Sequence, residues 1–201
     1  MLSYNTSKLM NPFIHLILRI CWLTLILYWT VSSFKAKKST QEEGLLKRII
    51  LYWLPLIVGA LLLGPGEWFG HMLIRENFVP HTNFVGAIGL CWCIAGVFIA
   101  CWSRYILGKN WSLAVQLKHE HELVVKGPYR LVRHPIYTGL LFLFIGNTLI
   151  VGDWRGIIAV AIVFVSFWYK LKKEEEWLFG VFGEQYIQYK ENTKALIPYL
   201  I

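Results

Sequence analysis

Five apolar stretches separated by short polar segments dominate the pattern of this sequence. They cover residues 12–34, 48–66, 83–107, 136–151 and 154–171. A helix that crosses a membrane needs about 20 mostly apolar residues, somewhat fewer where the bilayer thins. The pattern therefore predicts an all-α integral membrane protein with five transmembrane helices. We expect residues 1–82 to form a two-span N-terminal segment and residues 83–201 a three-span core.

The last two stretches are short, and only Gly152 and Asp153 separate them. So short a connection predicts a tight hairpin of two antiparallel helices. We expect Asp153 to cap the helix that begins at Trp154, because aspartate accepts hydrogen bonds from the free N–H groups of a first helical turn.

The composition agrees with a chain dissolved in lipid. Of the 201 residues, 56% are hydrophobic and 16% are charged, whereas soluble domains carry about 25% charged residues. The net charge is +8, but the positive residues lie between the apolar stretches, which favours orientation at an anionic membrane over nucleic-acid binding. The four cysteines lie inside apolar stretches without Cys-x-x-Cys spacing, so no metal site is predicted.

The basic residues also predict the orientation of the chain. Sixteen of the 20 Lys and Arg residues fall in the segments that follow the first, third and fifth stretches, when Arg48, Arg104 and Lys170 at the ends of stretches are counted with them. The positive-inside rule then places the N-terminus outside and the C-terminus in the cytoplasm. The membrane would be the cell inner membrane in a prokaryote or the endoplasmic reticulum in a eukaryote. Segments 104–135 and 172–201 would face the same compartment, and we expect the site where they meet the helical hairpin.

Arg133, His134 and Pro135 stand directly before the fourth apolar stretch. Proline is tolerated in the first turn of a helix and keeps the residue before it out of helical geometry. Arg133 and His134 would therefore lie at a positive helix N-terminus, which suits a carboxylate or phosphate. The alternative is that Arg133 snorkels to lipid headgroups, but Tyr137 and Gly139 just inside the span favour a pocket.

A second group of charges follows the fifth stretch, at Lys170 and at Glu174, Glu175 and Glu176. If the helix continues, Lys170 and Glu174 are four residues apart and share a face. Glu175 could then hold a cation together with nearby aromatic rings. The alternative is a solvated cluster of charges beside the membrane.

Taken in order, several motifs between residues 83 and 199 resemble the isoprenylcysteine carboxyl methyltransferase family and related phospholipid methyltransferases. They are LGKNWS, a glutamine before HELV, then GPY, RHPIYTG, EEEWL, FGEQYIQY and a final IP. The resemblance implies an all-helical membrane enzyme that binds S-adenosylmethionine without a Rossmann sheet. The residues that it implies for the cofactor site are Gln116, His121, Glu122, Leu123, Val124, Tyr129, His134, Pro135, Ile136 and Tyr137. Glu175, with Glu174, would close this site near the sulfonium or the substrate.

The sequence departs from the family at Lys170, where related enzymes carry an arginine before the glutamates. Arginine binds a carboxylate through two parallel hydrogen bonds, whereas lysine is a point charge. The expected reaction is methyl transfer from S-adenosylmethionine to the carboxylate of an isoprenylcysteine-like or other lipophilic acid in the bilayer, with Lys170 or Arg133 orienting the acceptor. The alternatives are phospholipid N-methylation, an NADPH-dependent reaction like that of sterol reductases, and a non-catalytic membrane interaction protein.

Overall fold

The computed structural model describes residues 10–34, 44–108 and 123–200. All regular secondary structure in these residues is helical, as predicted. The elements, in chain order, are α1 (Pro12–Ser33), α2 (Leu45–Arg48), the π-helical η1 (Ile49–Trp53), α3 (Leu54–Leu62), the short 3₁₀ turns η2 (Gly66–Phe69) and η3 (Leu73–Arg75), α4 (Asn83–Leu107), the 3₁₀ turn η5 (Gly127–Arg130), α5 (Pro135–Val151), α6 (Trp154–Phe182) and α7 (Glu184–Asn192).

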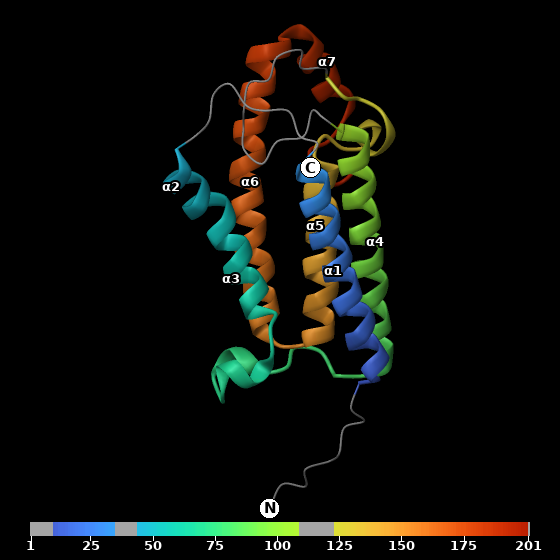
Figure 1. Cartoon of the computed structure of the whole chain (residues 1–201), viewed down its shortest axis with the longest axis vertical. Helices are drawn as coiled ribbons and strands as arrows, with labels where there is room; N and C mark the ends of the chain where they lie inside the picture. Colours follow the sequence, from blue (N-terminus) through green and yellow to red (C-terminus); the bar gives the residue numbers. More distant parts are fainter. Residues whose placement is uncertain (1–9, 35–43, 109–122, 201) are drawn as a thin grey trace, which may run out of the picture.

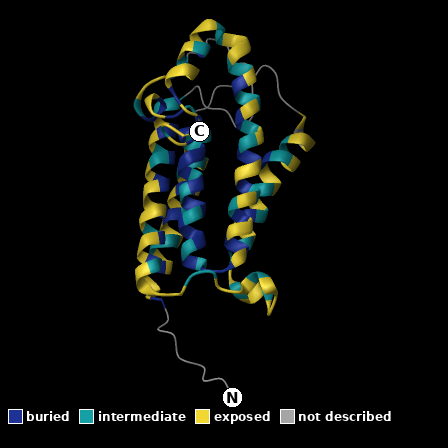
Figure 2. Cartoon of the chain, turned by 180° about the vertical axis from the view of Figure 1, so that it is seen from behind, coloured by how far each residue is buried: buried dark blue, intermediate teal, exposed yellow. Residues whose placement is uncertain are grey.

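The long helices run roughly along one axis (Figure 1), and many of their residues are exposed (Figure 2). Large apolar side chains are among these exposed residues. Three of the helices, α1, α4 and α6, are long and apolar enough to cross a membrane, and α5 is a shorter apolar helix of 17 residues. The chain therefore has the features of an integral membrane protein. Its five-span count and its orientation stay predictions.

The second apolar stretch differs from the single helix that its hydrophobicity predicts, because η1 interrupts its α-helical hydrogen bonding. Pro55 has no N–H group, so the carbonyl of Leu51 cannot accept the usual hydrogen bond from the residue four positions later. Ser166 of α6 supplies a replacement, since its hydroxyl donates to the Leu51 oxygen over 2.8 Å. Neighbouring serines commonly satisfy backbone groups that a proline frees in a membrane helix.

Glycines let α4 and α5 pack with their backbones in near contact. A Cβ atom added to Gly96 of α4 would lie 2.5 Å from the carbonyl oxygen of Gly139 of α5. Two turns earlier on α4, a Cβ atom added to Gly89 would lie 2.6 Å from the carbonyl oxygen of Gly146 of α5. Such small residues are typical of close helix pairs in membranes, where packing replaces the hydrophobic effect.

The predicted hairpin forms: α5 ends at Val151, Gly152 adopts a left-handed conformation with φ 73°, and α6 begins at Trp154. Asp153 occupies the cap position, but the expectation that its side chain caps α6 is wrong. Both of its carboxylate oxygens instead accept from Nε of Arg155, at 2.8 and 2.7 Å. Arginine two residues away offers a charged donor, which is a stronger partner for a buried carboxylate than a neutral backbone N–H.

Candidate active site

The site lies at the end of the bundle where α5 begins, α6 ends and α7 crosses over them (Figure 1). Backbone hydrogen bonds fasten the start of α5 to the segment after α7. The N–H of Arg133 donates to the oxygen of Lys194 over 2.8 Å, and the N–H of His134 donates to that of Ala195 over 3.0 Å. Because His134 precedes a proline, its backbone is free of the helix and available for this pairing. Two segments about 60 residues apart are thereby joined.

Arg133 connects three elements through its guanidinium group. Its Nε donates to Oε1 of Glu175 over 2.7 Å, and the two side chains are only 8% and 5% exposed. Its NH1 group donates to the backbone oxygens of Lys190 and Thr193. A buried ion pair is stable only when further hydrogen bonds satisfy its donors, as they do here. Arg133 thus braces the beginning of α5 against α6 and α7.

His134 is buried between two carboxylates. Its Nδ1 lies 3.5 Å from Glu174 Oε2, and its Nε2 lies 3.4 Å from Glu175 Oε1. Burial lowers the pKa of the imidazole, but the two glutamates outweigh it, and the pKa is raised above its usual value. Within the described residues, the buried Nε2 makes no hydrogen bond of good geometry, and Glu175 Oε1 is the carboxylate oxygen beside it.

Tyr137 lies one turn into α5 and joins the second glutamate to the cluster. Its hydroxyl donates to Oε1 of Glu174 over 2.6 Å. Its ring stacks on His134 on the α5 side and on Phe167 of α6, with centroid distances of 5.7 and 4.8 Å. The hydroxyl and both stacking contacts fix the ring, so its hydroxyl edge is held beside a carboxylate. That combination favours a cation such as a sulfonium.

Lys170 completes the cluster from one turn earlier on α6. Its ammonium Nζ lies 5.6 Å from the Tyr137 ring centroid and 5.1 Å from that of Tyr52. Tyr52 belongs to η1 and was not predicted as a site residue. Its sequence surroundings are uniformly apolar, so no local signal distinguishes it from a core aromatic.

The structure thus brings together six of the predicted residues: Arg133, His134, Tyr137, Lys170, Glu174 and Glu175. Tyr129 is buried next to them, and its backbone oxygen accepts from the hydroxyl of Tyr189 over 2.6 Å. Burial raises the pKa of the Tyr129 phenol, so it stays neutral at physiological pH.

The other predicted residues are less closely connected. Pro135 is buried in the first turn of α5, while Ile136, Leu123 and Val124 are half-buried. Gln116, His121 and Glu122 lie outside the described residues. The assignment of these positions to a cofactor site stays a prediction.

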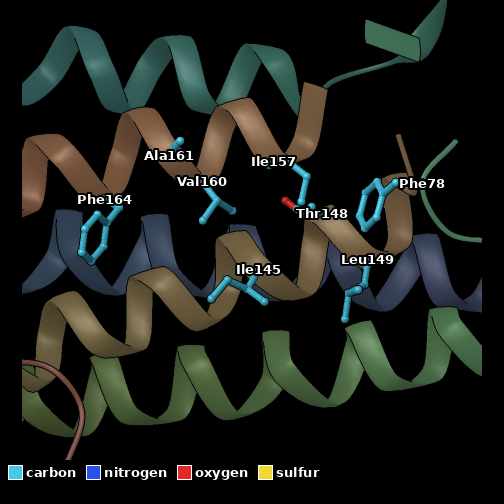
Figure 3. A pocket seen from close by; sticks show the side chains of 8 residues that line it. All are labelled: Phe78, Ile145, Thr148, Leu149, Ile157, Val160, Ala161 and Phe164. Atoms are coloured by element: carbon cyan, nitrogen blue, oxygen red, sulfur yellow. The ribbon is translucent and has the colours of Figure 1, made fainter. Parts of the chain in front are cut away.

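A separate apolar cavity of about 350 Å³ lies between α5 and α6, in the half of the bundle nearer their connecting turn (Figure 3). Ile145, Phe164 and Phe78 are among the side chains that line it. None of the predicted site residues contributes to it. The polar cluster and this cavity are therefore different features of the hairpin.

Comparison with known proteins agrees with this architecture. The sequence model of the phospholipid methyltransferase family matches residues 84–185. The protein-S-isoprenylcysteine O-methyltransferase of Schizosaccharomyces pombe is 26% identical over 186 residues, which cover 87% of this chain and 78% of the relative. Protein-S-isoprenylcysteine O-methyltransferase A of Arabidopsis thaliana is 28% identical over 144 residues, or 70% of this chain and 73% of the relative.

Among solved structures, the eukaryotic intramembrane Ras methyltransferase, isoprenylcysteine carboxyl methyltransferase, aligns with a TM-score of 0.53 and 25% identity. The alignment covers 74% of this chain but only 52% of the solved one, so this chain spans about half the length of that protein. Fold and sequence together define a class, the membrane-embedded methyltransferases. Within that class, the chain belongs to the isoprenylcysteine carboxyl methyltransferase family, as its motifs predicted.

Proposed function

We propose that this protein transfers a methyl group from S-adenosylmethionine to the carboxylate of an isoprenylcysteine or a similar lipophilic acid. The observation that carries the proposal is the meeting of His134 and Tyr137 with Glu174 and Glu175 at one end of an apolar bundle. The names of the relatives support the acceptor, since they are protein-S-isoprenylcysteine O-methyltransferases.

The donor set fits S-adenosylmethionine. When bound, this cofactor supplies an activated methyl group on a sulfonium, whose positive charge is lost as the methyl leaves. Glu174 offers a carboxylate to such a cation, the Tyr137 ring lies beside this carboxylate, and His134 adds a buried imidazole. We assign Tyr129, Pro135 and Ile136 to the same site, together with Gln116 and residues 121–124.

The transfer itself requires no general base. With S-adenosylmethionine bound, a carboxylate oxygen of the acceptor would take the methyl group, and the electron pair of the carbon–sulfur bond would remain on sulfur. The products are a methyl ester and a neutral thioether. What the chain contributes is alignment and the exclusion of water, which together supply much of the reduction in barrier.

Lys170 and Arg133 are the two basic residues expected to orient the acceptor. Arg133 is engaged by Glu175 and by two backbone oxygens, so its part is to hold the site together. We infer that the Lys170 ammonium binds the acceptor carboxylate. As a point charge it demands less of the geometry of the carboxylate than an arginine would.

The proposed arrangement in the membrane follows the charge distribution. Five spans would place the N-terminus outside and the site and the C-terminus in the cytoplasm. The chain would divide into a two-span segment, 1–82, and a three-span core, 83–201. The acceptor's apolar tail would lie in the bilayer beside them. Cysteines introduced at positions 120 and 185 should both react from the cytoplasmic side with a membrane-impermeant reagent. Labelling of the two positions from opposite sides would refute this topology.

The reaction is tested on detergent-purified protein with labelled S-adenosylmethionine and N-acetyl-S-farnesylcysteine. Calorimetry should show cofactor binding, and mild base should release the transferred label as methanol, because esters hydrolyse and methylamines do not. Failure to bind S-adenosylmethionine would overturn the proposal. Binding of NADPH instead would indicate a reductase, and binding of neither would indicate a non-catalytic membrane protein.

One alternative acceptor has an observation in its favour. The family model that matches this chain is that of phospholipid methyltransferases, so an amine headgroup is the second candidate. A base-stable methylated product from phosphatidylethanolamine vesicles, without ester formation on the farnesylated acid, would establish this alternative.

A further inference from the structure

Two arginines converge at the end of the bundle opposite the candidate active site, where α6 begins (Figure 1). Arg75 belongs to η3, and Arg155 lies in the first turn of α6. A Cβ atom added to Gly66 of η2 would lie 2.9 Å from Nη2 of Arg75 and 3.3 Å from Nη2 of Arg155. The two terminal nitrogens are therefore no further apart than these two distances together. The absence of a side chain at Gly66 allows this approach.

Within the described residues, one carboxylate faces these two guanidinium groups. Asp153 accepts from Nε of Arg155 through both oxygens, and the Arg155 side chain is only 6% exposed. Arg75 is exposed, and neither Glu67 nor Glu76 forms an ion pair with it in the part of the chain that the structure describes. One positive charge of the pair is thus left without a counter-charge there. Like charges at this spacing repel, and an anion between them would remove the repulsion.

The hydrogen bonds of the two side chains fix their positions and leave terminal donors available. Nη1 of Arg155 donates to the oxygen of Gly64 over 2.8 Å, and its Cζ lies 5.1 Å from the centroid of the Phe69 ring. Nη1 of Arg75 donates to the oxygen of Gly70 over 2.7 Å. Neither Nη2 group donates to another described residue. Guanidinium groups that present adjacent N–H donors match the oxygens of a phosphate.

The segment that carries Arg75 has the character of a membrane interface. Large apolar side chains are exposed on it, with exposed fractions of 62% for Trp68, 60% for Met72 and 80% for Leu73. Tryptophan is enriched at the level of the lipid headgroups, where the phosphates of the bilayer lie. The acyl chains of a lipid would remove these apolar side chains from water, whereas a free phosphate would leave them exposed. The surroundings therefore favour a lipid as the source of the anion.

We propose that Arg75 and Arg155 bind the phosphate of a phospholipid at this end of the bundle. The buried Arg155 supplies a fixed guanidinium group, and the exposed Arg75 contacts the same phosphate from η3. The bound lipid thereby joins the segment after α3 to the start of α6. A general excess of positive charge does not explain the pair, because most basic residues of the chain are predicted at the opposite end.

The test is the binding of dioleoylphosphatidylglycerol to detergent-purified protein, measured by native mass spectrometry. Arg75→Gln should weaken binding at least about tenfold, because it removes charge-assisted hydrogen bonds to the phosphate. Arg130→Gln is the matched control, since it removes an exposed arginine at the other end of the bundle, and it should bind as wild type does. Equal binding by wild type and Arg75→Gln, or an equal loss in Arg130→Gln, would overturn the inference.

Gly66→Ala tests the same site without removing a charge. The backbone of Gly66 is not in the left-handed region, so alanine is compatible with its conformation, but the added Cβ would push the two Nη2 groups away. Binding of the lipid should fall several-fold. This variant also decides the question if Arg75→Gln does not fold, because binding at the wild-type level in Gly66→Ala would contradict the proposed geometry.

Two further ligands identify the source of the phosphate. Inorganic phosphate lacks the acyl chains, and dioleoylglycerol has the same chains without the phosphate. Phosphatidylglycerol should raise the Tm of wild type but not that of Arg75→Gln, and neither of the other ligands should displace it. Inorganic phosphate that binds as tightly as the lipid would show a site for a soluble anion, and equal retention of dioleoylglycerol would show that the acyl chains alone bind. Either result would refute a phospholipid site, whether or not the protein transfers methyl groups.

Discussion

Glu175→Gln tests whether the buried ion pair with Arg133 organises the site. The substitution keeps the size of the side chain and removes its charge, leaving a guanidinium that is 8% exposed without its carboxylate. Breaking a buried pair by removing one partner costs about 3–5 kcal/mol. The backbone oxygens of Lys190 and Thr193 still accept from Arg133, so we expect the lower end of this range, about 3 kcal/mol.

This loss should be visible by thermal unfolding in detergent, followed by tryptophan fluorescence. For a chain of about 200 residues, each kcal/mol shifts Tm by about 2–4 °C, so Tm should fall by roughly 6–12 °C. Methyl transfer at a temperature where the variant is folded should also fall strongly. His134 loses one of the two carboxylates beside it, and the start of α5 loses its brace to α6.

Lys190→Met provides the matched control on the same carboxylate. Lys190 Nζ lies 3.3 Å from Glu175 Oε2, but the lysine side chain is 51% exposed. Exposed ion pairs contribute about 0–1 kcal/mol, so Tm should change by less than about 4 °C. The reasoning is refuted if Glu175→Gln melts at the wild-type temperature, or if Lys190→Met is equally damaging.

Three further predictions follow from individual contacts. Because the pKa of His134 is raised in the folded protein, its protonation stabilises the fold fully below about pH 6.5, and this contribution is lost as pH rises through the folded pKa. The Tm difference between wild type and His134→Gln should therefore shrink above about pH 6.5. A Tm difference that stays constant with pH would contradict this prediction. Gly96→Ala should destabilise by about 1–3 kcal/mol because its Cβ would meet α5 backbone, whereas Gly180→Ala, with open space around it, should not lower Tm. Thr138→Val removes a buried 2.7 Å hydrogen bond to the oxygen of Leu196 and should cost about 1–3 kcal/mol, with faster amide exchange in residues 193–200; unchanged exchange there would show that Thr138 does not fasten the tail.

Several elements were predictable because their causes are local. The third apolar stretch, 83–107, coincides with α4, and α5 begins at Pro135 as its proline predicts. The turn at Gly152 follows from the conformational freedom of glycine between two apolar runs. The continuation of α6 beyond Lys170 places Lys170 and Glu174 on one face, as the spacing of the charges indicates.

The partners of these residues were not predictable, because a sequence pattern encodes the faces of a helix and not what meets them. The sequence left Arg133 as a candidate for binding the acceptor, whereas packing of the C-terminal segment against α5 directs its guanidinium to Glu175 and to two backbone oxygens. The carboxylate of Asp153 likewise binds Arg155 instead of the backbone of α6.

The sequence by itself determined that this chain is a bundle of apolar helices with a cluster of charges at one end, because hydrophobic length and motif order are properties of neighbouring residues. Only the tertiary structure decided which charges neutralise one another and that Tyr52, from an apolar stretch without any motif, contacts Lys170. The physical reason is that ion pairs and cation–π contacts act over a few ångströms between side chains. Those distances are fixed only when helices far apart in the chain have packed together.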